Sequence, residues 1–291
     1  MLKKNKLILG TVQMGLNYGV NNIIGRNSEK VCHEILLNAY LSGIRTLDTA
    51  EAYGVAHHII GKFHKNYPLN RFSIITKLPH EINKNSIETR VKEYLNELGV
   101  ENIDVLMFHT FQSFEKNYSA IKLLEVLKEK GLVKNIGVSV YENFELRKLI
   151  DEDFVSVIQL PYNLFDNFSI RGELMQKLKS KGKIIHTRSA FLQGLFFKNR
   201  KDNNEIVRKL NKELLIIDNI ANNCTITIEE LALNYCIQEE NVDNVIIGVD
   251  SIEQLRSNLK ATNTLLKSEI LNEINEIKVD DLALLNPSLW K

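Results

Sequence analysis

The stretch GIRTLDTAEAYG, residues 43–54, contains the pattern on which the fold prediction rests. It predicts a short buried strand, Arg45–Asp48, that ends in a carboxylate, with Tyr53 in the loop beyond it. Similar runs recur toward both ends of the chain, and most are near-continuous apolar segments, as in strands buried on both faces. The other predicted strands are Leu7–Gly10, Phe72–Lys77, Val105–His109, Ile136–Val140, Val157–Leu160, Ile184–Thr187 and Val245–Ile247.

Amphipathic segments with helical spacing lie between these runs. Two of them are Ser86–Leu98, where we expect Ser86 to cap the helix, and Tyr118–Lys130. Eight strands alternating with helices predict an α/β fold, a (β/α)8 TIM barrel with a parallel eight-stranded barrel. The seventh interval is the longest, and we expect an extra helix, Glu205–Ala221, between strands seven and eight. No linker divides the sequence, so residues 1–291 are expected to form a single domain.

An open, doubly wound sheet is the alternative arrangement of alternating strands and helices. It would be favoured by a glycine-rich phosphate loop after the first strand. Gly10 and Gly15 are too sparse for that fingerprint, so the barrel is the preferred prediction.

The composition is that of an ordinary globular protein, with 44% hydrophobic and 25% charged residues and a formal net charge of +1. A near-neutral chain without long basic runs does not favour nucleic acid or an anionic membrane as a partner. The 3 cysteines have no metal-site or disulfide spacing, and His57 and His58 are adjacent and cannot share a helix face, so no metal is expected. No apolar run is long enough for a signal or a membrane span, which favours the cytoplasm.

Four chemically active side chains follow the predicted strands. Asp48 ends the second strand and Tyr53 follows it, Lys77 ends the third strand, and His109 ends the fourth. In a parallel barrel the C-terminal strand ends surround one mouth, where catalytic groups gather. We therefore expect a carboxylate, a phenol, an ammonium group and an imidazole to point into one site.

These groups suit proton transfer to a carbonyl. A phenol has an ordinary pKa of about 10, so a nearby cation is needed to favour its ionised form. Lys77 can supply that cation and Asp48 can hold it charged, while Tyr53 donates the proton and a neutral His109 orients the carbonyl oxygen. No side chain can supply a hydride, so a cofactor must bring it.

On these motifs the sequence resembles the aldo-keto reductase family, nearly from end to end. The resemblance implies an NAD(P)-dependent oxidoreductase that interconverts an aldehyde or ketone, including a sugar, and an alcohol. It also implies the catalytic set Asp48, Tyr53, Lys77 and His109. The matching stretches are LGTVQMG, GIRTLDTAEAYG, IITKLP, VLMFHT, KNIGVSVYE, VIQLPYN, RSAFLQGLF and VIIGVDSIEQLRSN.

The same resemblance implies a site for NADP(H) or NAD(H) across the barrel mouth. Ser139 and Gln159 would hold the carboxamide, and Arg188–Ser189 would flank the nicotinamide and pyrophosphate. A helix starting near Ser251 would turn its N-terminal amides toward phosphate. The remaining expected cofactor-binding residues are Thr11, Asp48, Gly248, Asp250, Gln254 and Asn258.

Several residues depart from the common form of the family. Val140 replaces a frequent asparagine, and Arg188 replaces an aromatic residue, where it could bind a pyrophosphate, an anionic substrate or a nearby carboxylate. Asp250 and Gln254 replace frequent cations near the adenosine, which favours NAD(H) unless a nearby arginine such as Arg256 substitutes or Asp250 only caps a helix.

Two other functions remain as alternatives. One is a nicotinamide-binding regulatory or sensor subunit with little turnover, as in some relatives. The other is a glycoside hydrolase, which needs two facing carboxylates, whereas Asp48 is the only acid expected in the mouth's interior. Trp290, near the C-terminus, is expected either to plug the barrel or to form part of the substrate wall.

Overall fold

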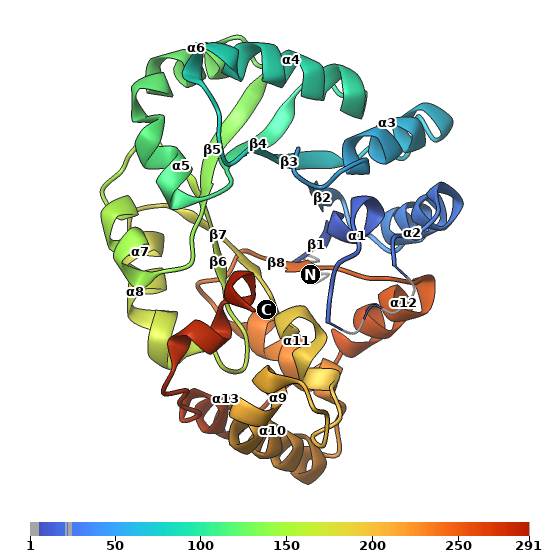
Figure 1. The fold of residues 1–291 in the computed structure, drawn as a ribbon, viewed down its shortest axis with the longest axis vertical. Helices are drawn as coiled ribbons and strands as arrows, with labels where there is room; N and C mark the ends of the chain where they lie inside the picture. The colour runs from blue at the N-terminus through green and yellow to red at the C-terminus, as the bar shows by residue number, and fades with distance from the viewer. Residues whose placement is uncertain (1–5, 21, 23–24, 291) are drawn as a thin grey trace.

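Eight parallel strands close into a barrel in chain order, with β8 paired to β1. The computed structural model describes residues 6–20, 22 and 25–290. The predicted (β/α)8 TIM barrel is confirmed, and Figure 1 shows the strands enclosed by helices. The strands are β1 (Leu7–Gly10), β2 (Thr46–Asp48), β3 (Ser73–Leu78), β4 (Ile103–Phe108), β5 (Val133–Ser139), β6 (Val157–Pro161), β7 (Ile184–Arg188) and β8 (Asn244–Ile247).

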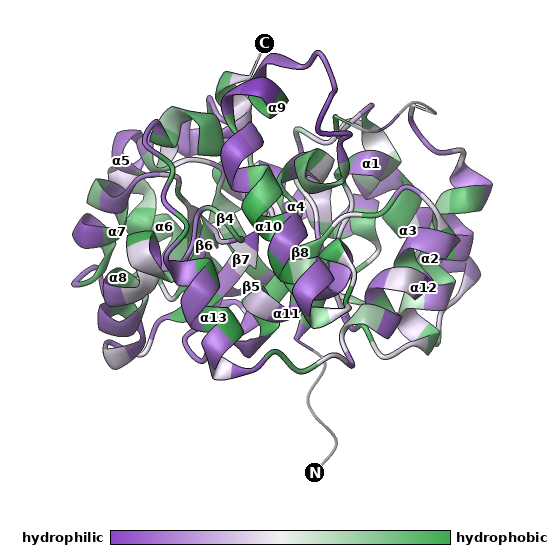
Figure 2. Ribbon diagram, turned by 90° about the horizontal axis from the view of Figure 1, so that it is seen from below, coloured by the Kyte–Doolittle hydropathy of each residue, from purple (hydrophilic) through white to green (hydrophobic). Residues whose placement is uncertain are grey.

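The helices cover the barrel with their apolar sides and turn hydrophilic sides outward, as Figure 2 shows for α8 and α13. They are α1 (Val12–Gly15), α2 (Glu29–Leu41), α3 (Ala56–Asn66), α4 (Ile87–Leu98), α5 (Phe111–Lys116), α6 (Ile121–Glu129), α7 (Asn143–Leu149), α8 (Phe168–Ser180), α9 (Glu205–Lys209), α10 (Asn211–Cys224), α11 (Ile228–Gln238), α12 (Ile252–Ala261) and α13 (Ser268–Asn275).

The alternation of side chains along each strand positions the site. A small buried cluster, separate from the larger core under the helices, consists of Ile8, Ile75, Val105, Met107, Val157 and Ile246. Side chains two residues apart point to the same face of a strand. Lys77, His109 and Gln159 each follow a cluster member by two residues, and they therefore continue the barrel interior upward to its C-terminal rim.

Two strands begin more than one residue earlier than the sequence predicted. β4 starts at Ile103 and β5 at Val133, because charged side chains on the outer face of the sheet pair across the two strands. Lys134 Nζ lies 3.0 Å from Asp104 Oδ1. The charged residues Asp104 and Lys134 therefore belong to the two strands, on their outer faces, and do not mark the points where the strands begin.

Three helix predictions need correction. Ser86 does not cap α4 through its side chain, because its hydroxyl donates to the carbonyl of Asn83 within a short 3-10 turn. The predicted helix Tyr118–Lys130 likewise begins with a 3-10 turn, and α6 proper starts at Ile121. The predicted extra helix Glu205–Ala221 is two helices, α9 and α10, which break at Leu210, and α11 also lies between β7 and β8.

Among the described residues, no helix combines the length and the apolar character that crossing a membrane requires. Residues 1–5, which the sequence analysis considered as the start of a signal segment, lie outside the described residues.

Candidate active site

A single cavity of about 980 Å³ opens at the C-terminal ends of the strands. All the residues that the sequence analysis assigned to catalysis or cofactor binding line it. From the catalytic set these are Asp48, Tyr53, Lys77 and His109, and from the cofactor set Thr11, Ser139, Gln159, Arg188, Ser189, Gly248, Asp250, Gln254 and Asn258.

The floor of the cavity contains a buried ion pair. Lys77 Nζ lies 2.6 Å from Asp48 Oδ1 and also donates to the carbonyl of Thr49 at 3.2 Å. The second oxygen of Asp48 accepts a hydrogen bond of 2.8 Å from Gln159 Nε2. Burial lowers the pKa of Lys77, and the negative charge of Asp48 opposes this change. The carboxylate thus stabilises the ammonium form in a place that water barely reaches.

The ring of Tyr53 lies close to both Lys77 and His109. Lys77 Nζ is 5.2 Å from the centre of this ring, and the imidazole of His109 meets it edge-on at 5.9 Å. The sequence analysis expected a cation to favour the ionised phenol. Instead, burial and then the charge of Asp48 raise the pKa of Tyr53, and only Arg188 opposes them. The phenol therefore keeps its proton at neutral pH, which is the form a proton donor needs.

Gly15 fixes the backbone of Tyr53. A Cβ atom at position 15 would lie 1.6 Å from the carbonyl oxygen of Tyr53, a distance that no side chain can adopt. The loops after β1 and β2 therefore pack backbone against backbone at this point. The absence of a side chain at Gly15 sets how deep the phenol reaches into the cavity.

The surroundings of His109 favour its neutral form. Burial lowers its pKa to about 3, and the positive charges of Lys77, His80 and Arg188 add to this effect. Its ring stacks on that of His80 at 4.3 Å, and its buried Nδ1 has no hydrogen-bond partner among the described residues. A neutral imidazole can still donate one hydrogen bond to an oxygen in the cavity.

The opposite end of the cavity is formed by the end of β8 and the start of α12. Ser251 caps α12 by accepting from the backbone of Gln254, so Asp250 is not the cap. The carboxylate of Asp250 instead accepts from Asn22 at 3.1 Å. Arg256 does not line the cavity, and it contacts Asn38 on α2. The arginine proposed as a substitute cation therefore points away from this end.

Arg188 does not form an ion pair with a carboxylate in the described part of the chain. Its Nη2 donates to the carbonyl of Val140 at 3.0 Å, and its guanidinium lies 4.0 Å above the ring of Tyr141. At the position where the family often has asparagine, the side chain of Val140 is buried. Its backbone oxygen accepts from Arg188, and its backbone N–H donates to the carbonyl of Gln159 at 2.9 Å.

Sequence reasoning missed several residues that line the cavity. The most informative are Gln13 and His80. Gln13 follows the first strand, and its position could have been found by the same strand-end argument that found Lys77. Trp290 does not line the cavity, since it packs on the hydrophobic core and donates to the carbonyl of Leu284, whereas the preceding residues 286–288 form part of the wall.

The cavity fits a dinucleotide. Its volume lies at the upper end of the range of about 300–1,000 Å³ that is usual for ligand pockets. Buried polar atoms without partners among the described residues, Gln13 Oε1 and His109 Nδ1, are available to a ligand. A side chain at Gly248 would collide with Gln13, so glycine keeps the path between the two ends open.

Comparisons with known proteins agree with this geometry. The sequence matches the Aldo/keto reductase family over residues 6–279. It is 24% identical to the NADH-specific methylglyoxal reductase of Escherichia coli (strain K12), over 89% of this chain and 90% of that protein. The structure is similar to the holo form of aldo-keto reductase AKR11C1 from Bacillus halodurans, with a TM-score of 0.77 and 21% identity over 93% of this chain and 91% of that chain. The apo form of the same Bacillus protein gives a TM-score of 0.69 and 22% identity, over 86% and 87% of the two chains.

Proposed function

The chain belongs to the aldo-keto reductase family of NAD(P)-dependent oxidoreductases, and we propose that it interconverts a carbonyl and an alcohol with Tyr53 as the general acid and base. One observation carries this assignment. Asp48, Lys77, Tyr53 and His109 line one cavity, with the Asp48–Lys77 pair at 2.6 Å. The centre of the phenol ring lies 5.2 Å from the ammonium nitrogen and 5.9 Å from the centre of the imidazole.

In the reducing direction each of the four side chains has a separate role. Bound NAD(P)H supplies the hydride for the carbonyl carbon. Tyr53 delivers a proton to the carbonyl oxygen, and Lys77 stabilises the phenolate that remains. Asp48 keeps Lys77 charged and in place, and neutral His109 donates a hydrogen bond to the same oxygen as negative charge develops on it.

The cofactor would lie across the mouth of the barrel. Ser139 and Gln159 would hold the carboxamide, and the start of α12 would face the phosphates. We propose that the reduced nucleotide is NADH, because Asp250 lines the adenosine end and Arg256 points away from it. A carboxylate there repels a 2′-phosphate and accepts a hydrogen bond from a free 2′-hydroxyl.

The test compares two matched removals of a phenolic hydroxyl. Tyr53→Phe is expected to lower kcat/KM about 10²- to 10⁴-fold, the usual share of general acid catalysis. Tyr40→Phe removes a hydroxyl outside the cavity and serves as the control. Turnover is measured with NADH and NADPH on methylglyoxal and a panel of other aldehydes, and nucleotide binding by fluorescence. Unchanged turnover in Tyr53→Phe, with nucleotide binding retained, would remove the mechanism.

A further inference from the structure

Arg188 presents a positive charge to the cavity, and no carboxylate of the described residues forms an ion pair with it. A guanidinium has five N–H donors, and the hydrogen bond that Arg188 makes among the described residues is the one to the carbonyl of Val140. Its face is covered by the ring of Tyr141, which leaves the edge of the fork toward the cavity. A partly buried charge of this kind is costly unless a ligand or a partner compensates it.

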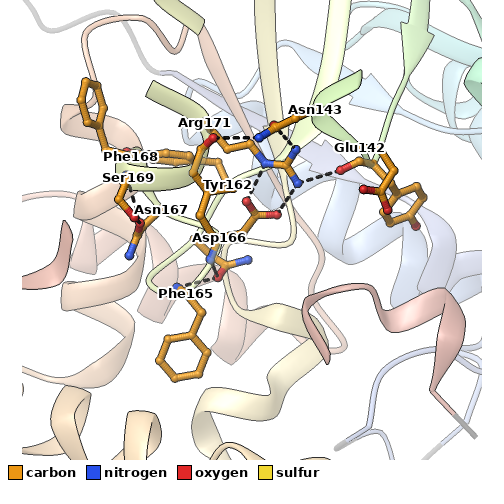
Figure 3. A network of polar contacts seen from close by, with 12 residues as sticks. Glu142, Asn143, Tyr162, Phe165, Asp166, Asn167, Phe168, Ser169 and Arg171 are labelled. Atoms are coloured by element: carbon orange, nitrogen blue, oxygen red, sulfur yellow. Dashed lines mark hydrogen bonds and ion pairs between the residues drawn. The ribbon is translucent and has the colours of Figure 1, made fainter. Parts of the chain in front are cut away.

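A second arginine, Arg171, contacts the same segment, residues 140–141, and its guanidinium is satisfied entirely by protein acceptors. Arg171 donates to the carbonyl of Tyr141 at 2.7 Å, one residue beyond the acceptor of Arg188. It also forms two hydrogen bonds with Asp166, of 2.6 and 2.8 Å, and one with Asn143, as Figure 3 shows. Every nitrogen of Arg171 is used within the protein, whereas Arg188 has no acid partner in the described part of the chain.

The acids closest in sequence to Val140 are already engaged. The carboxylate of Glu145 accepts from the backbone N–H groups of Tyr141 and Glu142, at 2.7 and 2.9 Å. The side chain of Glu142 accepts from the backbone of Glu145 in return, which completes the capping box of α7. Both carboxylates are held by the backbone at the helix start, and neither forms an ion pair with Arg188 among the described residues.

The direction of the side chain separates this charge from the phosphate end of the cavity. Arg188 ends β7, but its contacts are with Val140 and Tyr141 beyond the end of β5, so the side chain crosses over β6. It therefore leans away from β8 and the start of α12. Its positive charge also lowers the pKa of Tyr53 and of His109, which shows that it acts at the reaction end.

We propose that Arg188 binds an anionic group of the substrate, so that the preferred substrates are aldehydes or ketones that also carry a carboxylate or a phosphate. This inference rests on the carbonyl chemistry proposed above. The guanidinium would take the anion through a two-pronged hydrogen bond while Tyr53 and His109 hold the carbonyl oxygen. Arg188 is thus a specificity-determining residue and not a proton donor.

The experiment uses pairs of carbonyl compounds that differ in an acid group. Succinic semialdehyde is compared with butanal, and glyceraldehyde 3-phosphate with glyceraldehyde, so that the pairs distinguish a carboxylate from a phosphate. With NADH, kcat/KM is expected to favour the anionic member of at least one pair by about 10- to 100-fold, as for hydrogen bonds to a charged group. In Arg188→Met this ratio falls to about 1, and in Arg188→Lys it lies between the two values.

Two further measurements distinguish the possible failures. Arg208→Met removes an exposed arginine outside the cavity and should keep the wild-type ratio, which controls for net charge. Binding of unreactive succinate and inorganic phosphate to the NADH-bound enzyme is followed by NADH fluorescence. At least one of them should bind, with a Kd that rises about ten-fold or more in Arg188→Met. This arm tests the anion site even if no carbonyl is turned over.

The proposal is overturned by any of three results. The first is an equal kcat/KM of the wild-type enzyme for both members of each pair. The second is a kcat/KM ratio that is the same in Arg188→Met as in the wild type. Alternatively, Arg188→Met could weaken NADH binding while the substrate ratio stays the same, which would assign the guanidinium to the cofactor. A lack of turnover on every carbonyl, together with anion binding that depends on Arg188, would instead reject the proposed function and leave the anion site standing.

Discussion

Two buried ion pairs, Asp48–Lys77 and Asp166–Arg171, differ in how completely the protein uses their donors. Both have short contacts of 2.6 Å and side chains that are at most 8% exposed. The guanidinium of Arg171 is satisfied by protein acceptors on all three nitrogens (Figure 3). Lys77 has three N–H donors, and its protein acceptors among the described residues are Asp48 and Thr49.

The difference indicates what each pair does. Arg171, whose donors are all satisfied, joins Asp166 to Asn143 and to the carbonyl of Tyr141. A flat guanidinium with donors in fixed directions is well suited to such a structural contact. A pair with a remaining donor, facing the ring of Tyr53 across 5.2 Å, can respond to charge that appears during a reaction. The Asp166–Arg171 pair holds the start of α8 against the start of α7. The other pair is the one that we propose takes part in the chemistry.

The largest expected effect is on activity, at the pair in the cavity. Lys77→Met should lower kcat/KM about 10²- to 10⁴-fold, because Tyr53 loses the cation that stabilises its phenolate. Steady-state kinetics at a temperature where circular dichroism shows a folded enzyme measures this change. If the variant kept more than a tenth of the activity, the contrast between the two pairs would be lost.

The same replacement at the other pair should act on stability. Arg171→Met leaves Asp166 buried without its partner, and breaking a buried pair in this way costs about 3–5 kcal/mol. Urea unfolding should show that loss in the free energy of unfolding, with kcat reduced less than ten-fold while the protein is folded. A kcat as low as that of Lys77→Met would show that Arg171 also serves catalysis.

The smallest effect is on the protonation of His109. Lys77 contributes to the lowered pKa of about 3, so Lys77→Met should raise this pKa, although it stays below 6.5 because burial is the main cause. Between pH 6.5 and 3 the imidazole of His109 is protonated in the unfolded chain but not in the folded protein, so falling pH lowers the free energy of unfolding. This loss is smaller in Lys77→Met, because the pKa of His109 in the folded state is higher there. Imidazole NMR signals titrated from pH 7 down to the lowest pH at which the protein stays folded measure the shift. Arg171→Met should leave the titration of His109 unchanged.

Sequence patterns predicted the reactive pair and missed the structural one for a physical reason. Asp48 and Lys77 end apolar runs that read as strands, and parallel strands must bring their ends together. Arg171 reads as an ordinary helix residue and Asp166 as an ordinary loop acid. Their partner Asn143 begins α7, and no local pattern records such a long-range contact.

The same limit applies to smaller features. The break at Leu210 is invisible because both halves of the segment have helical composition. The raised pKa of Tyr53 depends on how deeply the phenol is buried, and a sequence gives no depth.

The close approach of Gly15 to Tyr53 has a consequence for engineering. The loops of a barrel are usually treated as interchangeable parts that can be swapped one at a time to change specificity. Here the first two loops share one backbone surface, so a foreign first loop with any side chain at position 15 would displace the phenol. These two loops must be transplanted together, as one cassette.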